Sequence, residues 1–307
     1  MTSSFVLNKS ETVFNLIRDI WENPETQKKI SSLMVFVFLA VLVVIELGRH
    51  QIFPESIQSH IPVNHLQAID FAFNLLLIKE VFDLILYLPR SISNAQRKQL
   101  QILSLILIRF AFKSLSQLGE PVTISTGTDS VNPIFEILAG SLGSLVIFVI
   151  IHFFYKIKNQ PLLVDPVQRD RFIAEKKLVA NVLIIFFFSV GIYYAPEIFF
   201  NFNLEPAMHI FFTIFIFGDI LIVLISLQYS QLFLTMFRNS GFALATVIAR
   251  ISITAPPYYR EALAIFSAIF SFLIAFVYNK SIVDVLDYLE SRKKMKDVKP
   301  LKKNKLN

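Results

Sequence analysis

The chain alternates between long apolar runs and short polar stretches. A helix that crosses a bilayer needs about 20 mostly apolar residues, because hydrocarbon offers no partners to unpaired backbone groups. The runs therefore predict an all-α, polytopic integral membrane protein with eight transmembrane helices. The predicted spans are 30–48, 66–89, 98–117, 133–155, 178–200, 207–229, 239–254 and 259–279.

The segment before the first span has a different pattern. Between Ser10 and Asn23, apolar residues recur at helical spacing opposite charged ones, which predicts an amphipathic helix lying on the membrane surface. The alternative is a helix that packs on the protein itself. The predicted organisation is a cytoplasmic segment at 1–29, a first membrane unit at 30–155, a basic connector at 156–177, a second membrane unit at 178–279 and a basic tail at 280–307.

Composition supports the membrane assignment. The 307 residues are 54% hydrophobic and 17% charged, with a mean hydropathy of +0.59. A soluble domain carries roughly 25% charged residues, so an ordinary soluble enzyme is excluded. The chain has no cysteine, which excludes disulfides, thiolate metal sites and cysteine nucleophiles.

Basic residues predict the orientation. With the N-terminus in the cytoplasm, most of the 29 Lys and Arg residues lie in cytoplasmic segments, and the outer loops hold only Arg49 and Arg260. This asymmetry obeys the positive-inside rule and predicts a cytoplasmic (inner) membrane protein with both termini in the cytoplasm. The basic tail from Arg292 onward is expected to bind anionic lipids of that leaflet. No nucleic-acid partner is expected, because the tail lacks aromatic residues for base stacking.

The first four spans resemble the last four. Short matching features occur in the same order in both sets, and an even number of spans separates them, which predicts two parallel four-helix repeats. The alternative is that apolar spans with basic inner ends resemble one another generally. The matched pairs are Lys28 with Lys176, Lys29 with Lys177, His65 with His209, Arg109 with Arg250, and Glu136 with Glu261.

Ionisable residues within the spans are the candidate site. A charge at the bilayer centre costs about 2.5–3.5 kcal/mol, so each one needs a partner or water. The candidate residues are Asp70, Lys79, Glu80, Asp83, Arg109, Lys113, Glu136, Asp219, Arg250 and Glu261.

Their depths predict the pairing. Arg109 is expected to pair near mid-membrane with Glu80, Asp219 or both, and Lys79 with Asp83 one helical turn away. One contact per repeat is also expected toward the outer face, between a basic residue and a glutamate. The residues expected in those contacts are Lys113, Arg250, Glu136 and Glu261.

These features favour a transporter or channel for an ion or small solute, with its site between the repeats around Arg109, Glu80, Asp219 and Arg250. One alternative is a non-catalytic membrane scaffold or signalling subunit, in which buried ion pairs fix helix register. Another is an intramembrane enzyme acting on lipid. Beyond the lipid bilayer, the expected partners are a second copy of the chain or a membrane partner subunit.

No cofactor or metal is predicted, and enzymatic activity is not favoured. The chain has no HExxH motif, no Walker A loop, no Rossmann glycine pattern and no GxSxG elbow. An outer-face metal site is conceivable, but histidines at an interface more often hydrogen-bond water. Its ligands would be His60, His65, His209 and Glu205.

Overall fold

The structure is a computed structural model. The residues that it describes form α-helices and the segments that connect them. That part is residues 2–303 apart from 55–57, 59–60, 62–63, 119–127, 158–165, 201–203 and 230–232. Side chains are described over the same residues except 2–6, 128–132, 166–167, 199–200, 205 and 284–303.

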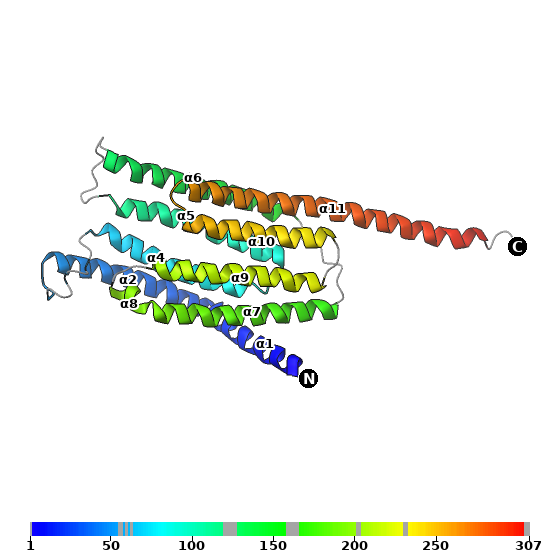
Figure 1. Cartoon of the computed structure of the whole chain (residues 1–307), viewed down its shortest axis with the longest axis horizontal. Helices are drawn as coiled ribbons and strands as arrows, with labels where there is room; N and C mark the ends of the chain where they lie inside the picture. Colours follow the sequence, from blue (N-terminus) through cyan, green and yellow to red (C-terminus); the bar gives the residue numbers. More distant parts are fainter. Residues whose placement is uncertain are drawn as a thin grey trace.

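Long helices lie side by side along one axis, and successive ones run in opposite directions (Figure 1). Helix α8 is too short to follow this arrangement, and helix α1 lies at an angle to the common axis. The bounds are Thr2–Trp21 (α1), Pro24–Arg49 (α2), Leu66–Tyr87 (α4), Ile92–Ser116 (α5), Thr128–Lys156 (α6), Pro166–Tyr193 (α7), Ala195–Phe200 (α8), Glu205–Tyr229 (α9), Phe233–Thr254 (α10) and Tyr259–Lys303 (α11).

Five of these helices are long and apolar enough to cross a membrane, which indicates a multi-pass membrane protein. Helix α4 is of similar length but is not one of these five, because four charged residues lie between Asp70 and Asp83 in the middle of the helix. The five helices are Pro24–Arg49, Ile92–Ser116, Pro133–Lys156, Pro206–Tyr229 and Tyr259–Val283.

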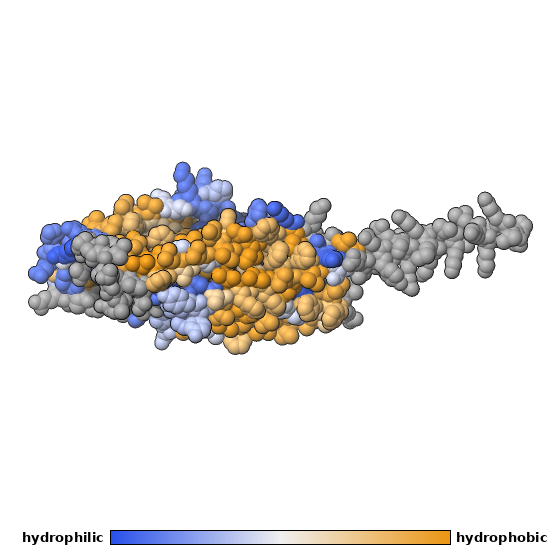
Figure 2. All heavy atoms as spheres, turned by 90° about the horizontal axis from the view of Figure 1, so that it is seen from above, coloured by the Kyte–Doolittle hydropathy of each residue, from blue (hydrophilic) through white to orange (hydrophobic). Residues whose placement is uncertain are grey.

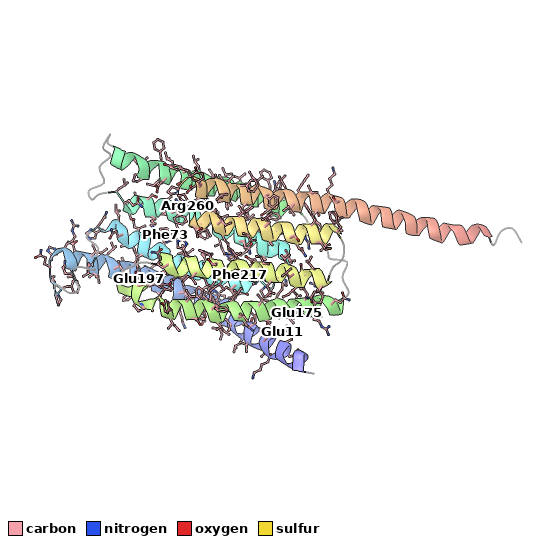
Figure 3. The ribbon with its side chains drawn as sticks, in the orientation of Figure 1. Glu11, Phe73, Glu175, Glu197, Phe217 and Arg260 are labelled. Atoms are coloured by element: carbon pink, nitrogen blue, oxygen red, sulfur yellow. The ribbon has the colours of Figure 1, made fainter. Side chains whose placement is uncertain are left out.

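The surface of the bundle is suited to lipid. A broad apolar band covers the middle of the face in Figure 2, and hydrophilic residues gather toward the left end. Phe36 on α2, Phe148 on α6 and Phe217 on α9 are each more than half exposed, and Phe217 is labelled in Figure 3. Large apolar patches of this kind mark a surface that contacts lipid or another protein.

Local sequence explains where several helices begin. Asn23 caps α2, because its side chain accepts a hydrogen bond from the backbone of Glu25, and Pro24 occupies the first turn where no amide partner is needed. Ser91 caps α5 in the same way by accepting from the backbone of Asn94.

Three predicted boundaries differ from those of the helices. The run 178–200 is not one helix, since α7 ends at Tyr193 and α8 starts at Ala195. Pro196 accounts for the break, because proline has no amide hydrogen to continue a helix. Helix α7 also begins at Pro166, within the predicted connector, and α11 continues past 279 to Lys303 and projects beyond the bundle (Figure 1).

Helix α1 packs on the protein, as in the alternative considered for this segment. Phe14 is 1% exposed, Trp21 Nε1 donates to Asp83 Oδ1 at 2.6 Å, and Lys177 Nζ lies 2.5 Å from Glu11 Oε1. Leu16 and Ile20 remain exposed on its other side. The helix therefore has one face on α4 and α7 and a second apolar face that is open.

The buried core has two parts. One cluster joins α1, α4, α7 and α9, and includes Phe82, Leu183 and Phe215. The other joins α5, α6, α10 and α11, and includes Leu107 and Phe242. The polar groups described below lie where these clusters meet.

Candidate functional site

A cavity of about 290 Å³ lies toward the end of the bundle at which α5 ends and α6, α9 and α11 begin. We call it the large cavity. Six helices contribute to it, and it therefore lies between the two predicted repeats. Its lining residues are Leu77, Arg109, Phe110, Lys113, Ser114, Gln117, Glu136, Met208, His209, Phe212, Ile253, Thr254, Ala255, Pro257 and Arg260.

The turn between α10 and α11 makes room for this cavity. In Figure 1 the turn lies farther inside the bundle than the neighbouring ends of α5 and α6, and Figure 3 places Arg260 at this recessed position. The turn is fixed by Glu261, whose Oε2 accepts a hydrogen bond from the backbone of Tyr258 at 2.6 Å. This is half of a capping box at the start of α11.

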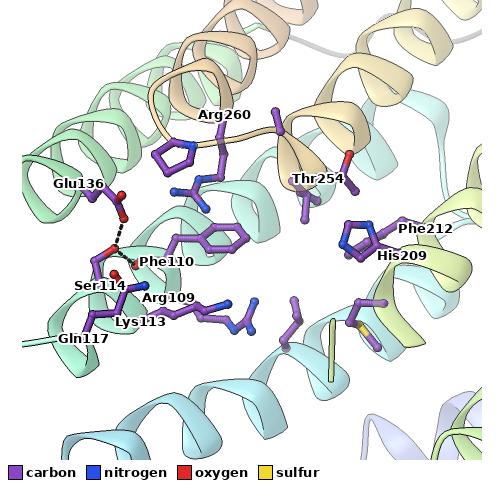
Figure 4. Close-up of a pocket in the computed structure, with 15 residues that line it drawn as sticks. Arg109, Phe110, Lys113, Ser114, Gln117, Glu136, His209, Phe212, Thr254 and Arg260 are labelled. Atoms are coloured by element: carbon purple, nitrogen blue, oxygen red, sulfur yellow. Dashed lines mark hydrogen bonds between the residues drawn. The ribbon is translucent and has the colours of Figure 1, made fainter. Parts of the chain in front are cut away.

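The large cavity has more basic than acidic groups among its described residues. Arg109, Lys113 and Arg260 line it together with one carboxylate, Glu136. Figure 4 shows Phe110 between the two arginines. The guanidinium carbon of Arg260 lies 3.8 Å from the centre of the Phe110 ring, and that of Arg109 lies 5.4 Å from it.

Arg109 does not pair as predicted. Its terminal nitrogen donates a hydrogen bond to Asn74 Oδ1 on α4. Asp219 instead pairs with Arg250, with 3.1 Å between Arg250 Nε and Asp219 Oδ2, and both side chains are at most 6% exposed. The predicted contacts of Arg109 with Glu80 and Asp219 are therefore wrong.

The recessed end of α10 explains this difference. Arg250 lies one turn before that end, and the sequence placed it near the outer face. Because the turn is recessed, Arg250 reaches Asp219 in the middle of α9.

Near the outer face, a glutamate of the second half contacts an arginine as predicted, but that arginine is Arg260 and not Arg250. Glu136 accepts a hydrogen bond from Ser114 Oγ at 2.7 Å, and Glu261 Oε1 lies 3.0 Å from Nε of the adjacent Arg260. The partners foreseen for these glutamates were Lys113 and Arg250. The sequence analysis placed Arg260 in an outer loop. Apart from its charge, nothing in the sequence indicated that it lines a cavity.

The residues of α4 behave as predicted within their own helix. Lys79 Nζ lies 2.9 Å from Asp83 Oδ2, which confirms the expected pair. Glu80 lies 3.8 Å from Lys79 and 3.9 Å from Lys98, and Asp70 accepts a hydrogen bond from Asn74 at 3.5 Å. Of the ten candidate residues, Arg109, Lys113 and Glu136 line the large cavity together, and the others form separate groups.

Two smaller cavities lie next to one another beside the large one, and each shares lining residues with its neighbour. The middle cavity, about 20 Å³, shares Phe212 and Ile253 with the large cavity and is also lined by Arg250. The far cavity, about 40 Å³, shares Gln99 and Thr246 with the middle one. The three cavities thus form a row. Each of the smaller two has room for at least one water molecule, which needs about 10–15 Å³.

Polar side chains from both repeats line the inner part of the row. Thr246 Oγ1 on α10 lies 2.5 Å from Gln99 Oε1 and 3.0 Å from Gln96 Oε1 on α5. Asp219 and Asn239 border the far cavity. Of these side chains only Asp219 was a candidate from the sequence, because the candidates were the ionisable residues of the spans.

Nothing in the described part of the chain forms a cluster of three or more metal-ligating side chains. His209 lines the large cavity, whereas His65 Nε2 lies 2.9 Å from Glu46 Oε2 on the neighbouring α2. The other two residues of the conceivable metal site fall outside the description, His60 entirely and Glu205 in its side chain.

Both apolar and polar side chains line the row of cavities. Comparison with known proteins found no matching family model, no matching curated protein and no matching solved structure.

Proposed function

We propose that the chain is a membrane transporter or channel for an ion or small solute, with its path between two four-helix halves. The observation that carries this proposal is the row of three cavities joined by shared lining residues. A polar interior with room for water at mid-depth is expected of a transport path. A purely structural core would be closely packed there.

Matching contacts in the two halves support the proposed duplication into parallel repeats. In the first half, Arg109 on α5 donates to Asn74 on α4; in the second, Arg250 on α10 donates to Asp219 on α9. The arginines at the starts of these helices also match. Arg97 lies 5.2 Å from the ring centre of Phe154 on α6, and Arg238 lies 4.3 Å from that of Tyr278 on α11.

The proposal includes eight spans, one within each of α2, α4, α5, α6, α7, α9, α10 and α11, and the span within α7 begins at residue 178. Their alternating directions are consistent with eight crossings of one membrane (Figure 1). Basic residues gather at the end where α11 leaves the bundle, so we assign that end, with both termini, to the cytoplasmic side of an inner membrane. The large cavity then opens toward the outside.

One observation favours the scaffold alternative. Arg250 and Asp219 form a direct, buried pair, and such a pair fixes helix register without any transport. The two functions differ in whether the row of cavities conducts a solute.

A flux experiment with a matched pair of variants tests the proposal. Thr246 lines the middle and far cavities, whereas Thr213 on α9 is exposed on the outside of the bundle. Proteoliposomes on a solid-supported membrane report charge movement after concentration jumps of potassium, chloride, phosphate or lactate. We expect Thr246→Leu to abolish the current found with the native protein and Thr213→Leu to leave it unchanged. Equal currents from both variants, or no current for any of these probes with the native protein, would contradict the proposal.

A further inference from the structure

We infer that the large cavity binds a small organic carboxylate, and that Arg260 holds the carboxylate group. This deepens the proposed function, since it names the class of solute that enters the path. The first observation is the state of Arg260 itself. Its side chain is 8% exposed and lines the cavity, and its Nε donates to Glu261 at 3.0 Å.

The terminal nitrogens of Arg260 have no hydrogen-bond acceptor among the described residues. They belong to a guanidinium held against the ring of Phe110, which fixes the plane of the group (Figure 4). A planar guanidinium edge in a cavity matches two oxygen atoms of one carboxylate, and hydrogen bonds between charged groups are about twice as strong as neutral ones.

The charge balance of the cavity gives the sign of the ligand. In the described part of the cavity, three basic side chains, Arg109, Lys113 and Arg260, stand against two carboxylates. Glu136 accepts a hydrogen bond from Ser114, and Glu261 pairs with Nε of Arg260 and leaves the terminal nitrogens of that arginine to the cavity. Basic groups brought together in a low-dielectric region raise one another's energy, and an anion between them lowers it.

The walls of the cavity indicate an organic body on the ligand. Leu77, Phe110, Met208, Phe212 and Ile253 add apolar surface to the same cavity, and Phe110 lies between the two arginines. An inorganic anion would leave this surface against water, whereas a carboxylate with a short apolar group covers it. A volume of about 290 Å³ suits a molecule with a few carbon atoms.

The large cavity also lies next to the narrowest part of the proposed path, where a solute would be bound before it passes further. Phe212 and Ile253 separate it from the middle cavity, which is only about 20 Å³. A ligand held by Arg260 is therefore on the wide side of this narrow point. Entry into the path then requires movement of these two side chains.

Calorimetric titration of the purified full-length protein in detergent tests this inference with two ligands of nearly equal shape. Benzoate has the carboxylate and an apolar ring, and benzamide is its neutral counterpart. We expect benzoate to bind at least about tenfold more tightly than benzamide. Equal affinities for the two, or tighter binding of phosphate or chloride than of benzoate, would overturn the inference. This comparison uses the native protein and does not depend on any variant folding.

Variants then locate the site. We expect Arg260→Gln to weaken benzoate binding by about tenfold or more and Arg260→Lys to restore only part of it, because lysine keeps the charge but loses the planar edge. Arg49→Gln is the matched control, since it removes the same charge at the same end of the bundle outside the cavity. Loss of binding in Arg49→Gln equal to that in Arg260→Gln would contradict a role for Arg260.

The inference and the proposed function fail differently. If benzoate binds but the flux experiment gives no current, the carboxylate site is supported and the proposed transport function is rejected. A current that Thr246→Leu abolishes, in a protein that does not bind benzoate, would keep transport and reject the carboxylate site.

Discussion

Among individual residues, the main finding is that two matching arginines have different partners. Arg250 is neutralised by the carboxylate of Asp219, while the hydrogen bond of Arg109 goes to the amide of Asn74. An amide stabilises a guanidinium without cancelling its charge. The two halves therefore place chemically different partners at matching contacts, an amide in the first half and a carboxylate in the second.

The Arg250–Asp219 pair predicts a strong, non-additive effect on stability. Asp219→Asn leaves a buried arginine without its counter-charge, which costs about 3–5 kcal/mol of unfolding free energy. The double variant Asp219→Asn, Arg250→Gln is expected to regain most of this loss, because neither residue is then charged. Denaturant unfolding in mixed micelles measures both values. A double variant as unstable as the sum of the two single variants would contradict the pairing.

Lys176 predicts a dependence of stability on pH. It lies in α7 before the proposed membrane span begins at residue 178, its Nζ donates to the carbonyl of Arg90 at 2.6 Å, and burial lowers the pKa of its amino group from 10.5 to about 7. Between these two values the unfolded chain holds a proton that the folded protein has lost. The folded state therefore gains stability as pH rises from about 7 to 10.5, by up to about 1.4 kcal/mol per pH unit, and this residue adds no slope below pH 7.

Lys176→Met removes this slope. The difference in unfolding free energy between native protein and variant, followed from about pH 6 to about pH 10, isolates the contribution of this one group. A difference that stays constant above pH 7 would show that the amino group does not titrate there.

Sequence reasoning succeeded for contacts within one helix and failed for contacts between helices. Lys79 and Asp83 are one turn apart, so their pairing follows from helical geometry alone. The partner of Asp219 depends on how deeply α10 sits beside α9, and that depth is set by the recessed turn after Thr254. Hydrophobic runs give the lengths of spans but not their relative depths.

At the scale of the helices, close packing between α5 and α6 is the clearest constraint. A Cβ added at Gly140 on α6 would lie 3.0 Å from the backbone oxygen of Leu107 and 3.3 Å from the Cβ of Ala111, both on α5. Gly191 on α7 has nothing within 4 Å of the same position. The two glycines are in similar helices and differ only in their neighbours.

This difference predicts opposite effects of one substitution. Gly140→Ala is expected to destabilise the protein by about 1–3 kcal/mol, because a backbone atom cannot move aside as a side chain can. Gly191→Ala is expected to stabilise it by up to about 1 kcal/mol through helix propensity. Unfolding in mixed micelles compares them, and a Gly140→Ala variant as stable as Gly191→Ala would show that these helices are not in close contact.

At the scale of the whole molecule, the sequence predicted the helical class and most helix positions, because long apolar runs allow few other structures in a membrane. It did not predict the row of cavities. Cavities depend on side chains that meet from helices far apart in the chain, such as Gln99 on α5 and Thr246 on α10. It also ended the last helix at 279, because α11 changes from apolar to basic composition there without any helix-breaking residue before Pro300.

The central claim is that water occupies the interior between the two halves, and reaction with silver ions tests it most directly. The native chain has no cysteine, so each single-cysteine variant has one reactive thiol. Membranes holding Thr246→Cys or Thr213→Cys are exposed briefly to Ag⁺, and intact-mass spectrometry measures the silver bound. The account predicts that Thr246→Cys binds Ag⁺, because an aqueous path reaches it, and that Thr213→Cys, which faces lipid, does not. A Thr246→Cys variant that binds no more silver than Thr213→Cys would contradict a hydrated path.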